Sequence, residues 1–199
     1  MHPPTYTALQ LDALGELANI GSGQAATALA AMLGRPVDIS IPEVRALALA
    51  DAVDALGPGE EQVTAVVLPV RGALDAAVLL LFGPADADRI AGLLGVPADD
   101  RALADSAIGE VGNVLGSTYL RAIAALAGGD VEPAPPTTLV DMRAALVASA
   151  LATGPADYDA AIVLDSQLTV AGEQCELAFV LLCGSADVAR LLARIGLGA

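Results

Sequence analysis

An eight-residue motif occurs twice in this 199-residue chain, and the repeat restricts the possible folds more than any other feature of the sequence. The copies are residues 12–19 (DALGELAN) and residues 106–113 (SAIGEVGN), so their offset is 94 residues (106 − 12). Each copy begins with Asp or Ser, has Glu four positions later, and has Asn three positions after the Glu. Matching residues continue downstream at the same offset: Gly34 with Gly128, Val37 with Val131, and Pro42 with Pro136. Similarity over this distance predicts an internally duplicated fold.

Each motif is predicted to lie on a long amphipathic helix. At about 100° per residue, the side chains of Asp12, Glu16 and Asn19 fall within roughly 40° of one line along the helix. The opposite arc is apolar and contains Leu11, Leu14, Leu17, Gly21, Ala25, Ala28, Leu29 and Met32. The equivalent polar residues of the second helix are Ser106, Glu110 and Asn113. We therefore expect two small polar sites, each on the outward face of a rigid helix.

The same two helices contain six glycines: Gly15, Gly21, Gly23, Gly109, Gly112 and Gly116. A glycine inside a helix costs about 1 kcal/mol relative to alanine. Six of them suggest that another backbone approaches these helices closely. That backbone belongs either to a docking partner or to the chain itself, if the two long helices pack on each other.

Both halves of the chain predict the same order of elements. The long helices should span about residues 7–33, opened by a capping box of Thr7 and Gln10, and about residues 101–127. Strands are expected near residues 37–41, 62–70, 75–82, 158–168 and 173–183, and from residue 131. Shorter helices are expected near residues 47–56, 85–94, 139–151 and 186–195. Near the ends of the two repeats, matching residues are 101 positions apart instead of 94, so repeat 2 has seven additional residues. We place these residues at the hairpin turn of repeat 2.

This pattern predicts an α+β fold in which two long helices pack on an antiparallel β-sheet. The whole chain, residues 1–199, should form a single domain made of two repeats related by a pseudo-two-fold axis. Repeat 1 spans about residues 7–96 and repeat 2 about residues 99–196, and each reads roughly α-β-α-β-β-α.

Composition excludes several classes of function. The net charge is −15 and all nine basic residues are Arg, which disfavours nucleic acid and membranes as partners. We interpret the acidity as a source of solubility for a chain that is 55% hydrophobic. Cys175 and Cys183 fit neither a zinc pattern nor a redox pair, and we expect them to be buried free thiols. The chain has no evident secretion signal or membrane span, so we expect a soluble, cytoplasmic protein.

On each long helix the polar residues form a stripe: Asp12, Glu16 and Asn19 on the first helix, and Ser106, Glu110 and Asn113 on the second. The groups that remain for chemistry are the Glu carboxylate and the Asn amide of each stripe. The only histidine is His2, and the absence of Lys rules out a Lys-containing phosphate loop. A magnesium site built from carboxylates would need more than one per stripe, and the second stripe has only Glu110. An Asn amide can hold a water molecule without repelling a phosphoryl group, whose transfer depends mainly on positioning and electrostatics. Neither residue makes a complete active site, so we infer that each stripe completes the active site of another protein.

The motifs resemble the two signatures of the CheC phosphatases of bacterial and archaeal chemotaxis, a family that also includes CheX and FliY-type proteins. The first signature is matched by residues 16–29 (ELANIGSGQAATAL) and the second by residues 106–115 (SAIGEVGNVL) with residues 117–120 (STYL). A Pro 23 positions after each Asn and the pair Asp141-Met142 also fit. The departures are Ala18, where Gly is usual, and Val114, where Ile is usual.

This resemblance implies a CheC-like fold and dephosphorylation of the phospho-aspartyl response regulator CheY. It implies that Asn19 and Asn113 orient the attacking water and that Glu16 and Glu110 pair with a Lys of the receiver domain. Asp12 and Ser106 would support the site by shaping or capping it. The protein would need no cofactor of its own, because Mg²⁺ belongs to the receiver.

The resemblance also implies binding of CheD, a receptor-modifying deamidase, although no residues assign that surface. With two motifs in one chain, we expect a monomer. The alternative is a non-catalytic adaptor that binds a receiver domain or CheD without hydrolysis.

Overall fold

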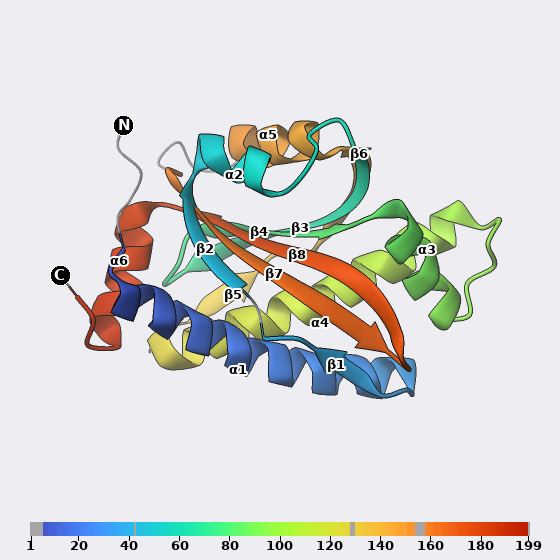
Figure 1. The fold of residues 1–199 in the computed structure, drawn as a ribbon, viewed down its shortest axis with the longest axis horizontal. Helices are drawn as coiled ribbons and strands as arrows, with labels where there is room; N and C mark the ends of the chain where they lie inside the picture. The colour runs from blue at the N-terminus through green and yellow to red at the C-terminus, as the bar shows by residue number, and fades with distance from the viewer. Residues whose placement is uncertain (1–5, 42, 128–129, 154–157, 199) are drawn as a thin grey trace.

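A curved antiparallel sheet with helices on both of its faces makes up the fold (Figure 1). The computed structural model describes residues 6–41, 43–127, 130–153 and 158–198. Within these ranges the helices are α1 Ala8–Leu33, α2 Leu49–Ala55, α3 Pro84–Leu93, α4 Arg101–Ala127, α5 Arg143–Thr153 and α6 Ser185–Arg194. The strands are β1 Val37–Ile39, β2 Glu43–Ala48, β3 Gln62–Gly72, β4 Ala76–Phe82, β5 Val131–Pro133, β6 Thr137–Met142, β7 Ala160–Val170 and β8 Glu173–Cys183.

The two halves of the chain exchange strands within the sheet. The sheet order is β1-β7-β8-β4-β3-β5, and in addition β2 pairs with β7 and β6 pairs with β3. The first two strands of each repeat therefore pair with the hairpin of the other repeat. At the centre β4 pairs with β8, and Leu79 lies opposite Val180. These two residues are 101 positions apart, the offset of the repeat in this region, so an approximate two-fold axis passes between them.

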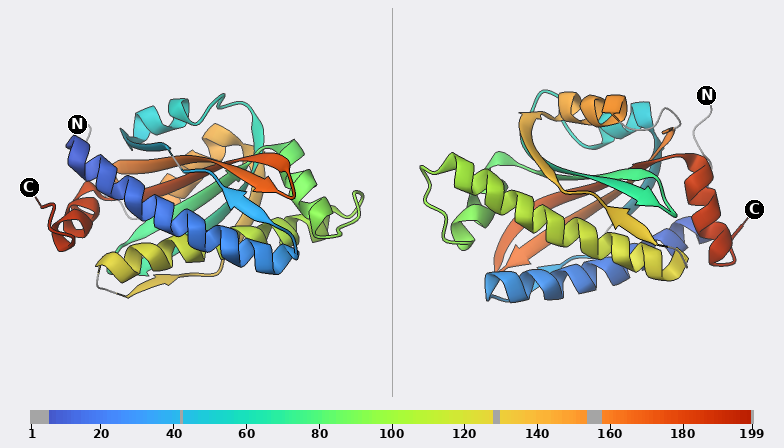
Figure 2. Two further views of the ribbon diagram at one scale, coloured as in Figure 1. Left: turned by 60° about the horizontal axis from the view of Figure 1, so that its bottom comes forward. Right: turned by 180° about the vertical axis from the view of Figure 1, so that it is seen from behind.

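The long helices α1 and α4 lie side by side on one face of the sheet, and α2 and α5 cover the other face (Figures 1 and 2). In Figure 1, α1 and α4 run in opposite directions, as the two-fold axis requires. Two clusters of buried side chains follow from this arrangement, one under α1 and α4 and the other under α2 and α5. Strand β4 is buried along its whole length because successive side chains enter the two clusters alternately: Val78 and Leu80 the first, Leu79 and Leu81 the second.

The ends of the two long helices follow local rules. In α1, Gln10 N bonds to the Thr7 hydroxyl and the Gln10 side chain bonds back to Thr7 N, which confirms the predicted capping box. Gly34 ends this helix with a φ of 63°, in the left-handed region that favours glycine. At the start of α4 the Asp100 carboxylate accepts a hydrogen bond from Leu103 N at 3.0 Å.

Two of the predicted helices begin too early. Residues 47–48 belong to strand β2, and residues 139–142 belong to strand β6, where Leu139 pairs with Ala65. These segments are rich in Ala, Leu and Val, so their sequence resembles a short helix, and distant strands supply the pairing that decides the outcome.

The prediction that all seven additional residues of repeat 2 lie at its hairpin turn was also partly wrong. Helix α5 has 11 residues where α2 has 7, so four of the additions lie in α5 and not at the hairpin.

Candidate functional site

The polar stripe of α1 faces away from the sheet. Asp12, Glu16 and Asn19 are exposed, whereas Leu14 and Leu17 between them are buried against the core. The helix has this orientation because its apolar arc covers strands of both repeats. The structure thus places the three predicted residues of the first site together, on one accessible face of a 26-residue helix.

The second stripe lies on α4 and is less open. Ser106 and Glu110 are exposed, but Asn113 is half-buried. The Ser117 hydroxyl donates to Asn113 Oδ1 at 3.3 Å, a long hydrogen bond that restrains the amide. The equivalent position on α1 is Gly23, where a Cβ would meet nothing within 4 Å. The two sites therefore have the same predicted residues but different surroundings.

The two stripes lie on opposite sides of the contact between α1 and α4. At this contact Gly21 lies so close to Tyr119 that a Cβ on Gly21 would be 2.7 Å from the Tyr119 ring. Each stripe is N-terminal to the contact on its own helix, and the helices are antiparallel (Figure 2). The structure consequently separates the sites and does not combine them into one pocket.

Most of the helix glycines serve packing within the chain. A Cβ on Gly112 would lie 2.6 Å from Val66, one on Gly116 would lie 3.0 Å from Leu68, and one on Gly109 would lie 2.7 Å from Thr138 Oγ1. Among the six, only Gly23 faces open space. The interpretation of these glycines as evidence for a docking partner was therefore wrong for most of them. The alternative, that the two long helices pack on each other, holds for Gly21, which meets Tyr119 of α4. The glycines of α4 pack against strands of the sheet, which the sequence did not reveal.

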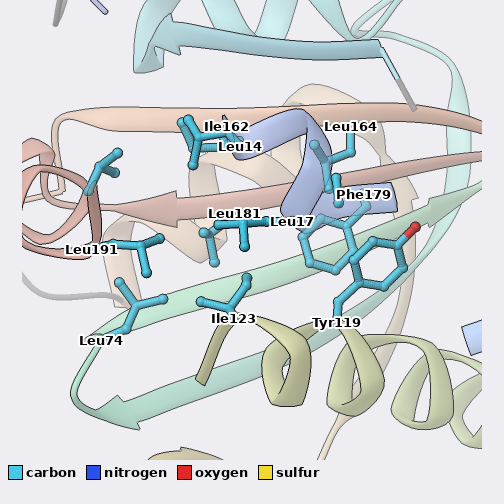
Figure 3. A pocket seen from close by; sticks show the side chains of 12 residues that line it. Leu14, Leu17, Leu74, Tyr119, Ile123, Ile162, Leu164, Phe179, Leu181 and Leu191 are labelled. Atoms are coloured by element: carbon cyan, nitrogen blue, oxygen red, sulfur yellow. The ribbon is translucent and has the colours of Figure 1, made fainter. Parts of the chain in front are cut away.

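An apolar cavity of about 30 Å³ lies between α1, α4, α6 and the sheet. Figure 3 shows Leu14 and Leu17 reaching it from α1, Tyr119 and Ile123 from α4, and Phe179 from β8. The rings of Tyr119 and Phe179 are 4.7 Å apart. The cavity has room for about one water molecule and offers almost no polar partners, so it is a packing defect and not a substrate pocket.

Burial shifts the pKa values of the ionisable groups in the core. Burial raises the pKa of Tyr119, and the hydrogen bond with the Ser22 hydroxyl opposes this shift. Cys175 and Cys183 are buried and unbridged, as predicted, and burial raises the pKa of both thiols, that of Cys183 to about 12.

Within the described ranges, no group of three or more His, Cys, Asp and Glu side chains is arranged to hold a metal ion. None of the helices in the described part of the chain combines the length and apolar character needed to cross a membrane.

The arrangement can present a carboxylate and an amide to another protein, twice. On each helix the Glu precedes the Asn by three residues, so both side chains project from one face about one turn apart. The Glu can accept hydrogen bonds from a cation, and the Asn can both donate and accept. Helix-borne groups of this kind are held more rigidly than groups on loops.

Comparison with known proteins agrees with this geometry. The sequence pattern of the CheC-like family matches residues 9–45 and 103–140, two segments that contain the two stripes. The chain is 30% identical, over 175 residues, to the CheY-P phosphatase CheC of Bacillus subtilis, and the match covers 84% of each protein.

Two solved structures share the fold. FliY of Thermotoga maritima superposes with a TM-score of 0.75 and 19% identity, over 97% of this chain and 98% of FliY. CheX of Borrelia burgdorferi, solved in a CheX–CheY–BeF3–Mg complex, superposes with a TM-score of 0.53 and 13% identity, over 83% of this chain and 96% of the other. Both likenesses concern the fold alone. From its duplicated motifs, its architecture and its 30% identity to CheC, the chain belongs to the CheC-like family.

Proposed function

We propose that this protein is a phosphatase that hydrolyses the aspartyl phosphate of a CheY-type response regulator. The observation that carries the proposal is a Glu/Asn pair at equivalent positions of α1 and α4, with both residues exposed on α1 and the Asn half-buried on α4, in a chain 30% identical to a CheY-P phosphatase. The first pair is Glu16 and Asn19, and the second is Glu110 and Asn113. A stripe on the outside of a helix suits insertion into the active site of another protein better than it suits binding of a small molecule.

In the proposed reaction the Asn amide positions the nucleophile. Its side-chain oxygen accepts a hydrogen bond from a water molecule and holds the water in line with the phosphorus–oxygen bond that will break. The water oxygen attacks phosphorus, the aspartate carboxylate leaves, and the proton of the water passes to the phosphate product. Because the amide is neutral, it does not repel the negatively charged phosphoryl group.

The Glu of each pair fixes the approach of the receiver. Glu16 and Glu110 are exposed carboxylates that can pair with a Lys of the receiver next to its phosphorylation site. Asp12 and Ser106 lie one turn before them and support the helix surface at the edge of the contact. The chain supplies no cofactor in this scheme, since Mg²⁺ enters with the receiver. One copy of the chain carries both sites, so a monomer suffices.

The proposal is tested by the decay of phosphorylated CheY-type receiver in the presence of the purified protein. The wild-type protein should accelerate decay, and the double variant Asn19→Ala, Asn113→Ala should lose about 100-fold or more of the acceleration while still binding the receiver. The matched control is Gln24→Ala, an exposed polar change on α1 outside the stripe, which should leave the rate unchanged. Binding without any acceleration by the wild-type protein would favour the adaptor alternative.

A further inference from the structure

The strand beside the second stripe exposes large apolar side chains. On β6, Leu139 is 40% exposed, Val140 is 49% exposed and Met142 is 50% exposed. Strand β6 pairs on one side with β3, and no partner strand on its other side is present in the described part of the sheet. Three exposed apolar side chains within four residues are more than the scattered single cases that a protein surface normally carries.

The strand beside the first stripe has no such surface. The repeat offset of 94 residues makes Arg45, Ala46 and Ala48 of β2 the counterparts of the three β6 residues, and all three are half-buried. Arg45 forms an ion pair with Asp165 and donates to Ala55 O at 3.2 Å. The apolar side chains on β6 are therefore absent from the first repeat and are not required by the duplicated fold.

The apolar side chains of β6 border the turn of α4 that carries Glu110. Thr138 lies against Gly109, the neighbour of Glu110, and side-chain alternation places Val140 and Met142 on the same face of the strand as Thr138. Val140 lines a groove of about 370 Å³ together with Ile108 of α4. In the right-hand view of Figure 2, β6 curves from α5 down to α4. We call Val140 and Met142 together the β6 surface.

The size of a protein contact explains why such a surface would be needed. The stripe from residue 106 to residue 117 is about 16 Å long, and it is only one side chain wide. A specific protein interface usually buries about 800 Å² on each partner. A receiver domain engaged by Glu110 and Asn113 must therefore contact surface beside the helix, and the strand that lies there is β6. The charged side chains that line the groove are Asp105 and the ion pair of Arg101 with Asp88.

We propose that the β6 surface is a docking surface for the phosphorylated receiver domain and that it serves the second site alone. This inference rests on the proposed function, which supplies the occupant. No exposed apolar strand surface lies beside the first site, whose exposed apolar side chains, Leu9 and Ile20, are on α1 itself. The duplicated protein thus carries two sites with the same reacting groups but different docking surfaces.

The test uses the full chain with one site disabled at a time. Glu16→Arg with Asn19→Ala disables the first site, and Glu110→Arg with Asn113→Ala disables the second. Into each background we introduce Val140→Thr with Met142→Gln, which removes apolar character while roughly preserving side-chain size. When only the second site works, the change should raise KM for the phosphorylated receiver about fivefold and leave kcat unaltered. When only the first site works, neither constant should change. The matched control on β2, Ala46→Ser, should leave the second site unaffected.

Equal effects in both backgrounds, or no effect on the second site, would overturn the inference. A separate measurement distinguishes this result from failure of the proposed function. Calorimetric titration with receiver activated by beryllium fluoride gives the dissociation constant without requiring hydrolysis. The β6 change should raise this dissociation constant about fivefold when the second site is intact, and should not raise it when only the first site is intact. That result would support the docking surface even if the wild-type protein does not accelerate decay. An unchanged dissociation constant would refute it.

Discussion

The hydroxyl group of Tyr119 on α4 lies 2.5 Å from the hydroxyl group of Ser22 on α1, and this contact joins the two helices that carry the candidate sites. Both side chains are buried, and the Ser22 hydroxyl also bonds to Ala18 O at 3.0 Å. The Tyr119 ring reaches this position by passing over Gly21. Small residues on α1 therefore allow a large ring on α4 to hold the two helices together.

Substitutions at Gly21 and Gly23 should change stability in opposite directions. Gly21→Ala should lower the free energy of unfolding by about 1–3 kcal/mol, because the new Cβ overlaps the buried Tyr119 ring. Gly23→Ala is the matched control, since it adds a Cβ in open space, and it should raise the same quantity by up to about 1 kcal/mol through helix propensity. Urea denaturation followed by circular dichroism measures both. Equal and small effects would mean that α4 lies farther from Gly21 than the structure indicates.

Each single Asn variant should keep part of the phosphatase activity. The stripes lie on opposite sides of the contact between α1 and α4, so the loss of Asn19 leaves Asn113 in place and the reverse is also true. We expect Asn19→Ala and Asn113→Ala each to retain measurable acceleration of receiver decay, with rates that together approach that of the wild type. If either single change abolished activity, the other stripe would have no catalytic role.

Neutralising the carboxylates should weaken docking more than catalysis. The combined variant Glu16→Gln, Glu110→Gln keeps side-chain size and removes the charge that would pair with a receiver Lys. KM should rise several-fold with a smaller change in kcat, and the dependence of KM on ionic strength should become shallower, because salt screens charge pairs. Steady-state kinetics at low and high salt tests this expectation, with Asp51→Asn on α2 as a surface control. A fall in kcat alone would place the carboxylates in the chemical step.

Stability should decline at alkaline pH because of a buried thiol. Burial raises the pKa of Cys183 to about 12, whereas the thiol in the unfolded chain has a pKa of about 8.5. The folded state therefore retains a proton that the unfolded state loses, so the stabilisation is complete below about pH 8.5 and disappears as pH rises toward 12. Denaturation midpoints measured from pH 8 to pH 11 should fall for the wild type and fall less for Cys183→Ala. If the midpoints of the wild type and of Cys183→Ala fall in parallel with pH, the loss of stability at alkaline pH comes from other groups. One of these is Tyr6, whose pKa is also raised by burial, to about 12.

Local sequence was sufficient to predict the long helices and their faces. The spacing of Leu14 and Leu17 against Glu16 and Asn19 is a property of one helix, and Thr7 and Gly34 mark its ends through contacts within a few residues. The hairpin strands β3, β4, β7 and β8 were likewise predicted close to their observed bounds. Strands β2 and β6 were both missed, because their Ala- and Leu-rich segments take their conformation from partners roughly 70 to 120 positions away.

The sequence by itself determined that the fold is duplicated, which side chains face outward, and which Glu and Asn residues form the two stripes, since helical periodicity and an internal repeat are both read along the chain. Tertiary structure alone decided that the repeats exchange strands, that Gly109 and Gly112 accommodate the sheet, and that the strand beside the second stripe exposes large apolar side chains whereas the strand beside the first stripe does not. The reason is physical: strand pairing and side-chain contact join residues that are far apart in sequence, and the two copies of a repeat can meet different neighbours.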